Sequence, residues 1–411
     1  SGTIAATPGG LDWSTAVVTG STVTVEAGRG YFINTTSNIC TVTLPASPEV
    51  GDQIVLADYA RTWATNAVTL DSNGNNFQGE ADTYTVDYDT VGQSLNIVYA
   101  DSTKGWLPVS DDAVAFDHGA PPTQKAIFGF GYNGSADVSI TNLVNSSGVV
   151  ASDTTGVGTA RESLAAAGYG GDKALFGYGL ASSTTAVTNL VSNSGVVSAD
   201  TSGVGTARKY LAAASYGGDK ALFGFGILAN ETIMSITNLV SNSGVVSADT
   251  TGVGTGRYGL AAAGYGGDKA IFGYGQNASG YVSMTNKVSS SGVVASDTGG
   301  VGSGRVNLTA AGYGTDKAIF GFGYTGSLTG ITNLVNNSGN VAADVSGVGT
   351  ARFHLAAAGY GGDKAIFGFG KTSGEVSMTN LVNTSGVVAA DVTGVGTARA
   401  YLAAAGFSLS A

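Results

Sequence analysis

A phrase that ends in arginine recurs through most of this chain and sets a long, regular period. The phrase is Gly-Val-Gly-Thr-Ala-Arg with small variations, and successive copies lie 47, 49, 48, 47 and 47 residues apart. Its six arginines are Arg161, Arg208, Arg257, Arg305, Arg352 and Arg399. A period of this length is typical of β-propeller blades rather than of helical repeats.

Each copy contains four strand-like runs separated by turns. In one copy the runs are residues 355–358, 365–370, 379–382 and 387–388. The second run alternates bulky residues with glycine, so that large rings can pack where neighbouring backbone approaches closely. No segment shows a sustained apolar stripe with the 3.6-residue period of a helix. The sequence therefore predicts an all-β chain.

The two ends of the repeat array complement each other. The first copy begins at Lys125 and lacks the Leu-Ala-Ala-Ala run, whereas the last copy stops at Phe407 and contains that run alone. An open solenoid needs polar caps at its ends, but a ring needs its first and last units joined. We therefore predict that residues 125–411 form a six-bladed β-propeller closed by the C-terminal strand. A β-helix with two rungs per repeat is the alternative, but it gives no reason for complementary ends.

The layout of the repeat resembles that of the kelch repeat. An arginine, an inner strand, paired glycines, an apolar second strand and a third strand follow one another in the same order. The matching residues are Arg208, Gly217, Gly218 and the runs 221–226 and 237–240. The chain departs from the kelch pattern where Tyr178 splits a second glycine pair, and no repeat has the fourth-strand tryptophan. The resemblance implies a kelch-like propeller.

The part of the chain before the repeats reads as short strands with turn residues between them. The runs are residues 22–26, 30–36, 40–45, 53–59, 67–71, 83–88, 94–99 and 106–110. They predict an antiparallel β-sandwich at 22–110, in which the lone Cys40 is a buried apolar side chain. Residues 1–21 are expected to form an N-terminal arm. Residues 111–124 are expected to form a linker that Pro121 and Pro122 keep extended.

Several motifs in this part resemble a small β module of bacteriophage tail-fibre and other virion appendage proteins. The motifs are residues 30–36, 43–48, 51–52, 92–94 and 104–106. The resemblance implies a virion structural protein, assembled in the host cytoplasm. It also implies that this module attaches to other virion proteins and that the chain is a homotrimer.

The net negative charge lies before the repeats. Residues 1–118 hold three basic and fourteen acidic residues, a net charge of −11 that equals the charge of the whole chain. Nucleic-acid binding needs clustered lysine and arginine, so no nucleic-acid partner is expected. The sequence has no run of 18 apolar residues, so no membrane insertion is expected either.

The repeated arginines are expected to be structural. An aspartate lies eight residues before each of them, as Asp153 precedes Arg161. We expect each arginine to pair with this nearby carboxylate and with carbonyl groups, and so to fix the loop between two blades.

The residues offer little for catalysis. The chain has two histidines, His118 and His354, and no His/Cys cluster with metal-ligand spacing. We predict no enzymatic activity and no cofactor or metal. A polysaccharide-cleaving appendage is an alternative, which would need two carboxylates about 5–10 Å apart. The acidic residues found in one repeat only are Asp137, Glu162, Glu231 and Glu375.

Two zones differ between the repeats, one after each arginine and one after each Gly-aromatic-Gly. Because consecutive strands run in opposite directions, both connections emerge on the same face. We predict that this face binds a host-surface glycan or protein through aromatic and charged side chains. The candidate binding residues are Tyr132, Glu162, Lys209, Tyr210, Tyr258, Asn277, Tyr281, Tyr324, Phe353, His354, Lys371 and Tyr401. A purely structural joint or decoration that contacts only virion proteins is the alternative.

Overall fold

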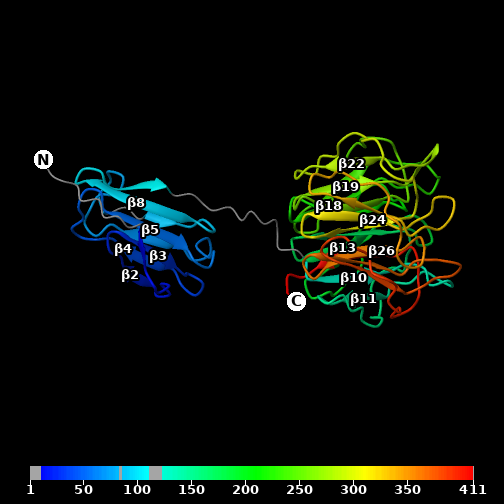
Figure 1. The fold of residues 1–411 in the computed structure, drawn as a ribbon, viewed down its shortest axis with the longest axis horizontal. Helices are drawn as coiled ribbons and strands as arrows, with labels where there is room; N and C mark the ends of the chain where they lie inside the picture. Colours follow the sequence, from blue (N-terminus) through cyan, green and yellow to red (C-terminus); the bar gives the residue numbers. More distant parts are fainter. Residues whose placement is uncertain (1–10, 83–85, 111–122, 411) are drawn as a thin grey trace. The chain divides into compact units, whose positions relative to one another are not determined.

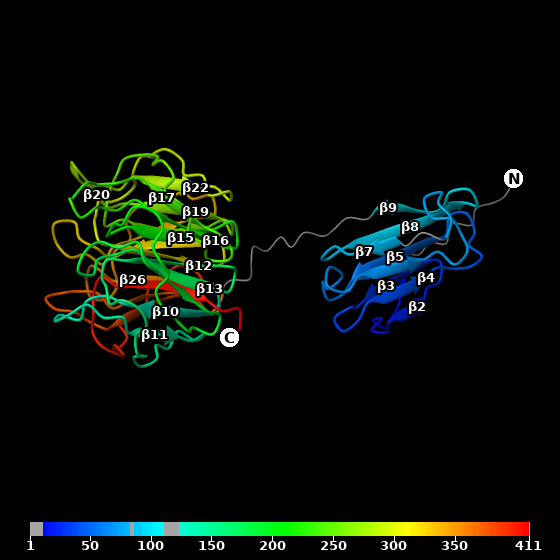
Figure 2. The same cartoon turned by 180° about the vertical axis from the view of Figure 1, so that it is seen from behind.

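The computed structural model describes residues 11–82, 86–110 and 123–410 and is all-β, as predicted. The chain divides into two compact units, Ser1–Asp117 and His118–Ala411, which Figures 1 and 2 show from opposite sides. Within the described ranges no residue lies in a helix, and so no helix there could cross a membrane. The predicted linker falls almost entirely outside the described residues.

The first unit contains two β-sheets, and the chain alternates between them. One sheet has the strand order β1-β3-β5-β8-β9 and the other has the order β2-β4-β6-β7. The strands are β1 (Asp12–Trp13), β2 (Thr22–Thr24), β3 (Arg29–Ile33), β4 (Cys40–Thr43), β5 (Gln53–Asp58), β6 (Val68–Asp71), β7 (Val86–Tyr88), β8 (Ser94–Asp101) and β9 (Gly105–Ser110). Every predicted run contains a strand, although residues 83–85 lie outside the described part of the chain.

The prediction that these strands pair antiparallel is wrong for the first half of the unit. β3 pairs in parallel with β1 and β5, and β4 pairs in parallel with β2 and β6. After each strand from β1 to β5 the chain crosses to the other sheet, so it returns to the sheet it left in the same direction. The later pairs β5–β8, β8–β9 and β6–β7 are antiparallel.

The N-terminal arm also needs correction, because part of it belongs to the first sheet. Asp12 and Trp13 pair with Arg29 and Gly30. A Cβ atom at Gly30 would lie 2.6 Å from the Trp13 ring, so glycine is required there for the indole to lie across the strand.

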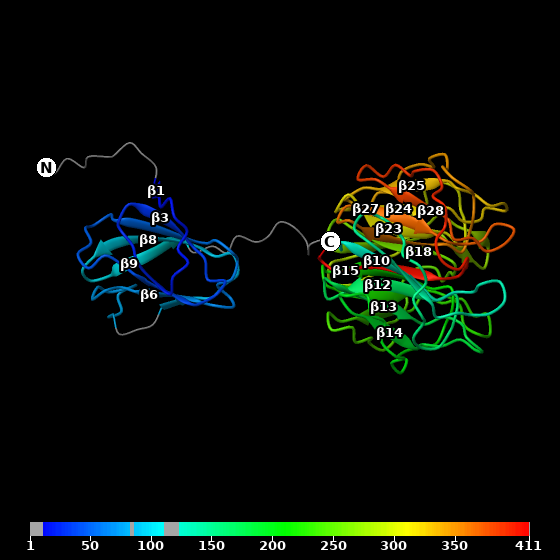
Figure 3. The same ribbon diagram turned by 90° about the horizontal axis from the view of Figure 1, so that it is seen from below.

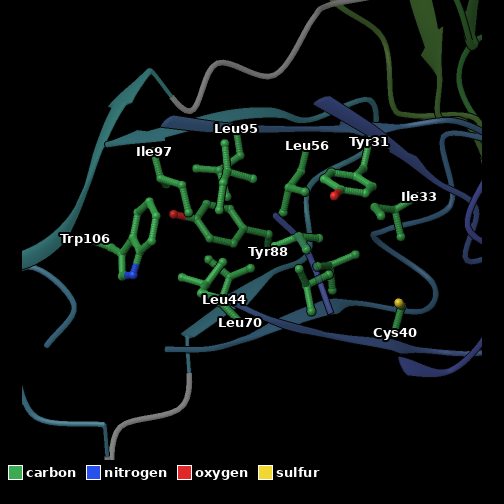
Figure 4. Close-up of a cluster of buried hydrophobic side chains, with 14 of the residues drawn as sticks. Tyr31, Ile33, Cys40, Leu44, Leu56, Leu70, Tyr88, Leu95, Ile97 and Trp106 are labelled. Carbon is green, nitrogen blue, oxygen red and sulfur yellow. The ribbon is translucent and has the colours of Figure 1, made fainter. Parts of the chain in front are cut away.

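One apolar core lies between the two sheets (Figure 4). Ile33, Leu56 and Ile97 point into it from the first sheet and Leu70 from the second, and all four are buried. Cys40 is buried in the same core, as predicted, and burial raises the pKa of its thiol.

The second unit consists mainly of six three-stranded antiparallel sheets. Five of them follow one another along the sequence. Their strands are β12 (Ala165–Tyr169), β13 (Lys173–Gly177) and β14 (Thr188–Val191); β15 (Ala212–Tyr216), β16 (Lys220–Gly224) and β17 (Thr237–Val240); β18 (Ala261–Tyr265), β19 (Lys269–Gly273) and β22 (Thr285–Val288); β23 (Thr309–Tyr313), β24 (Lys317–Gly321) and β25 (Thr332–Val335); and β26 (Ala356–Tyr360), β27 (Lys364–Gly368) and β28 (Thr379–Val382). A short hairpin, β20 (Gln276–Asn277) and β21 (Gly280–Tyr281), projects from the third of these sheets.

The sixth sheet joins the two ends of the repeat array (Figure 3). β10 (Lys125–Gly129) lies between β11 (Thr141–Val144) and β29 (Ala403–Phe407), and it pairs antiparallel with both. The complementary fragments of the sequence thus form one sheet. The first strand of each sheet, including β29, lies against the first strand of the next, so the six sheets follow one another in a closed cycle.

Rings and glycines interlock between successive sheets. A Cβ atom at Gly177 would lie 2.6 Å from the ring of Phe223 in the next sheet, and Gly368 and Phe128 show the same contact at 2.7 Å across the join. The predicted packing of large rings against glycine is therefore confirmed, and it continues from the last repeat to the first.

The predicted fourth run of each repeat is not a regular strand. It forms isolated bridges with the third strand, as Val150 does with Val144 and Thr154 with Thr141. One extra residue lies between these bridges on the fourth run, which is a bulge. The Asn142 amide donates to the carbonyl of Ala151 inside this bulge, at 2.9 Å.

Candidate functional site

Each repeat arginine is fully buried and fixes the entry to its sheet. Arg161 donates from Nε to the carbonyl of Tyr178 at 2.9 Å, from Nη1 to that of Thr159 at 3.0 Å, and from Nη2 to Asn189 Oδ1 at 2.8 Å. Its guanidinium carbon lies 4.3 Å from the ring centroid of Phe130 in the preceding sheet. Burial lowers the pKa of Arg161 to about 10, so the group stays charged at neutral pH and supports the structure.

The other five arginines repeat this arrangement with one exception. Arg305 keeps its bonds to the carbonyls of Phe322 and Ser303. Its Nη2 and the Oδ1 of Asn333 are buried without a hydrogen-bond partner among the described residues.

The prediction that each arginine pairs with the aspartate before it is wrong. Asp153 accepts hydrogen bonds from Thr397 and lies 4.0 Å from Arg399, at the other end of the repeat array. The arginine precedes the first strand of a sheet and its aspartate follows the last run of the same sheet, so the pair joins the two ends of one sheet. Burial opposes ionisation of Asp153, but hydrogen bonds from Thr397 and Asn142 and the charge of Arg399 lower its pKa overall.

Six residues form a closed ring of backbone hydrogen bonds at the start of the first strands. Each lies two residues after its arginine, has a φ between 54° and 58°, and donates its N–H to the carbonyl of its counterpart in the preceding sheet at 2.7–3.0 Å. The members are Ser163, Tyr210, Gly259, Asn307, His354 and Tyr401. The left-handed conformation is uncommon for residues other than glycine, and here all six share it.

This ring surrounds a cavity of ≈ 130 Å³, which we call the mouth cavity. Leucine and alanine side chains of the first strands, such as Leu164 and Ala166, line it below the ring. A second cavity of ≈ 230 Å³ lies at the other end of the same strands and is lined by glycines and by Thr123. The chain therefore enters the second unit on the side opposite the mouth cavity.

The two variable zones lie side by side, as predicted. The residue after each arginine forms an antiparallel bridge with the residue after a Gly-aromatic-Gly. The pairs are Glu162–Leu180, Lys209–Ile227, Tyr258–Gln276, Val306–Tyr324, Phe353–Lys371 and Ala400–Tyr132. We call the ring of six hydrogen-bonded residues around the mouth cavity the mouth ring. The surface formed by the mouth ring and by these bridged pairs is called the mouth face.

Seven aromatic side chains form a continuous series over the mouth face. Neighbouring ring centroids in the series lie between 3.7 and 6.2 Å apart. In order, the series is Tyr281, Tyr324, Phe353, His354, Tyr401, Tyr210 and Tyr258. His354 and Tyr401 are stacked at 3.7 Å, and Tyr210 approaches both at 6.1–6.2 Å although their sheets are not its neighbours in the cycle.

The charged residues of the mouth face fall into two classes. Lys209 Nζ lies 3.2 Å from Glu231 Oε1, and Lys371 Nζ lies 2.8 Å from Glu375 Oε1. The carboxylate of Glu162 is half-buried and makes no hydrogen bond or ion pair with a described residue. Burial raises the pKa of Glu162 and the charge of Asp137 adds to the rise, while Lys209 and Lys371 oppose it. Burial also raises the pKa of Asp137.

His354 and Tyr210 are held in their neutral forms. Burial lowers the pKa of His354 to about 3, and the charge of Lys371 adds to this effect. Burial raises the pKa of Tyr210 to about 12. Neither ring nitrogen of His354 has a hydrogen-bond partner among the described residues, and the side chain lines the mouth cavity.

Seven of the twelve predicted binding residues form the aromatic series, and Glu162, Lys209 and Lys371 are the charged residues described above. The other two belong to neither group. Tyr132 pairs through its backbone with Ala400 and Asp137. Asn277 lies in the β20–β21 hairpin, where its Oδ1 accepts the N–H of Ser279. Sequence reasoning missed Ser163, Gly259 and Asn307 as cavity-lining residues. Their constant position, two residues after each arginine, was the signal that could have identified them.

Among the described residues, no group of three or more His, Cys, Asp or Glu side chains could hold a metal ion. No protein-family model matches this chain, and no curated protein sequence matches it.

Proposed function

We propose that the second unit is a six-bladed, kelch-like β-propeller and that the first unit is a β-sandwich. The propeller is supported by the closed cycle of first strands and by the pairing of β10 with β29. The ring of backbone hydrogen bonds, which passes once through every sheet, gives it independent support. The sandwich is supported by the single core that the two sheets of the first unit share.

On this architecture, the chain is a non-enzymatic bacteriophage virion appendage. The first unit attaches to other virion proteins, and the mouth face recognises a glycan or protein of the host surface. The observation that carries this proposal is the aromatic series, because it lies where the repeats differ. Tyrosine rings supply large contact areas at low entropic cost and stack on sugars. Thr123, near the start of the second unit, lies at the cavity opposite the mouth face.

The electrostatics favour binding over cleavage of a polysaccharide. Glycosidases use two carboxyl groups whose environments push their pKa values apart, so that one is an acid and the other is ionised. Burial instead raises the pKa of both Asp137 and Glu162, and neither has a cationic partner in contact among the described residues. The pKa shifts of this pair run in the same direction, whereas a hydrolytic pair needs them to run apart.

The experiment that tests the proposal is binding of the fluorescently labelled full chain to candidate host cells, with unlabelled chain as competitor. We expect saturable binding that weakens at least about tenfold when Tyr210→Ala and Tyr401→Ala are combined. The matched control is Tyr59→Ala in the first unit, whose side chain is exposed and which should leave binding unchanged. Absence of saturable binding to every susceptible host, with a folded chain, would favour the structural joint instead. Release of sugar from host polysaccharide would favour the enzyme.

A further inference from the structure

The mouth cavity is covered unevenly by its ring of six residues. Tyr210, His354 and Tyr401 place large rings on one part of it, whereas Ser163, Gly259 and Asn307 contribute smaller side chains to the rest. A Cβ atom at Gly259 would lie 2.5 Å from Asn307 Oδ1. Glycine at this position therefore lets the Asn307 amide lie close to the rim.

His354 is a polar group without a partner at this opening. A neutral imidazole has one N–H donor and one acceptor nitrogen, and neither is used within the described part of the chain. Its side chain is only partly buried, so water reaches the ring nitrogens, and a ligand group that both accepts and donates a hydrogen bond can replace this water. A hydroxyl does both.

The charges of the mouth face select against an anionic ligand. Asp137, Glu162, Glu231 and Glu375 provide four carboxylates, and Lys209 and Lys371 provide two ammonium groups. Both ammonium groups are already in ion pairs. A carboxylate or phosphate brought to this face would meet unpaired Glu162 and Asp137, and no described residue of the face supplies a free cation to offset them.

The size of the opening limits what enters it. The cavity of ≈ 130 Å³ has room for several water molecules, since one water needs about 10–15 Å³. One ring-sized group would displace these waters, whereas a folded polypeptide segment would not fit below the rim.

We propose that the mouth cavity binds, end-on, the terminal residue of an uncharged carbohydrate. One hydroxyl of this neutral pyranose pairs with the imidazole of His354, and its C–H face packs against Tyr210 and Tyr401. The carboxylate of Glu162 accepts a second hydroxyl. This inference rests on the proposed function and names the ligand class of the same face.

The test uses the full chain and matched pairs of methyl glycosides in saturation-transfer NMR and calorimetry. The pairs are glucoside with glucuronide, galactoside with galacturonide, and mannoside with mannuronide, each sharing its ring stereochemistry and differing in charge at C6. We expect at least one neutral member to bind saturably and its uronide to bind at least about tenfold more weakly. Equal or tighter binding of the uronides would overturn the inference, and so would failure of all three neutral glycosides.

Two variants locate the binding in the mouth cavity. His354→Phe keeps the ring packing and removes the hydrogen-bonding nitrogens, so affinity for the neutral glycoside should fall about tenfold. Ser163→Tyr places a large ring at a position whose own side chain is small and buried, so it should abolish binding, and its melting temperature is measured to show that the chain stays folded. The control is Tyr265→Phe at the opposite cavity, which should bind like the unchanged chain. If both mouth variants bind normally, the ligand lies elsewhere and the inference is wrong.

The outcomes for the two proposals are separable. The chain could bind cells, with binding weakened by Tyr210→Ala and Tyr401→Ala, and yet bind no neutral glycoside. That result would contradict the proposed ligand class but support the recognition function. Loss of saturable cell binding would remove the function itself.

Discussion

The two ends of the six first strands differ in what the repeats keep constant. At the end opposite the mouth cavity, five copies carry the same aspartate-lysine turn, with Nζ and Oδ1 2.7–2.8 Å apart in each. At the mouth, the backbone is equally regular, but the six ring positions hold Ser, Tyr, Gly, Asn, His and Tyr. A regular backbone with uniform side chains indicates a structural role. A regular backbone with different side chains marks the place where the chain can specialise.

The largest effect should come from breaking the framework that both ends share. Ending the chain after Arg399 removes β29, and with it buried Leu402 and Phe407. Since each such side chain contributes about 2–5 kcal/mol, we expect the cooperative thermal transition of the second unit to be lost or to move down sharply. Ending the chain after Ser408 is the control, because it keeps β29 and removes the exposed Leu409. An unchanged melting temperature after the longer deletion would refute the role of β29 in closing the ring of sheets.

The next largest effect should come from replacing the repeat arginine, and its size should differ between two copies of the repeat. Arg399→Met should lower the free energy of unfolding by about 3–5 kcal/mol, because Asn142, Asp153 and a buried carbonyl lose a charged partner. Arg305→Met should cost about 1–2 kcal/mol less, because Arg305 makes no hydrogen bond to its asparagine. Urea unfolding measures both values, and equal losses would show that the asparagine contact contributes nothing.

A smaller effect should come from the mouth cavity, where His354 makes the stability of the folded chain depend on pH. The unfolded chain protonates His354 near its usual pKa of 6.5, whereas in the folded chain this pKa is about 3. Stability from this group is therefore fully present above pH 6.5 and is lost as the pH falls toward 3. His354→Phe should remove this slope, on the order of 3 kcal/mol, in thermal melts between pH 7 and pH 4. Parallel pH profiles of variant and unchanged chain would contradict a buried, neutral imidazole.

The smallest effect should come from the opposite end. Lys317→Ala breaks an ion pair whose side chains are 42% and 34% exposed, so stability should change by about 0–1 kcal/mol. Binding to cells and to glycosides should be unchanged. A loss of binding would mean that the uniform end also takes part in recognition.

The sequence could predict those parts of the fold for which a pattern of residues depends directly on a contact. The complementary ends of the repeat array predicted that its first and last strands pair, as β10 and β29 do. The alternation of Phe with Gly predicted that large rings pack against glycine, as Phe223 does on Gly177. Alternation along a strand reports which face is buried but not the direction of the partner strand. The parallel pairs of the first unit therefore could not be predicted.

The candidate site was predictable in its location but not in its construction. The aspartate eight residues before each arginine was the nearest in sequence, whereas the sheet brings together an arginine and the aspartate that ends the same sheet, as with Arg399 and Asp153. The constant position two residues after each arginine was a signal for the ring, but the residue types there did not indicate a shared left-handed conformation. Of its members only Gly259, Asn307 and His354 belong to the residue types that favour this conformation.

The mouth ring is joined through main-chain atoms, and this has a consequence for how such a chain can change over generations. Its N–H and carbonyl groups are the same whatever side chains the six positions carry. Substitutions there keep these hydrogen-bonding groups, provided that neighbouring side chains still fit, as those at 259 and 307 must. Each combination gives a differently shaped opening. A chain built in this way can acquire a new ligand without first having to repair its fold.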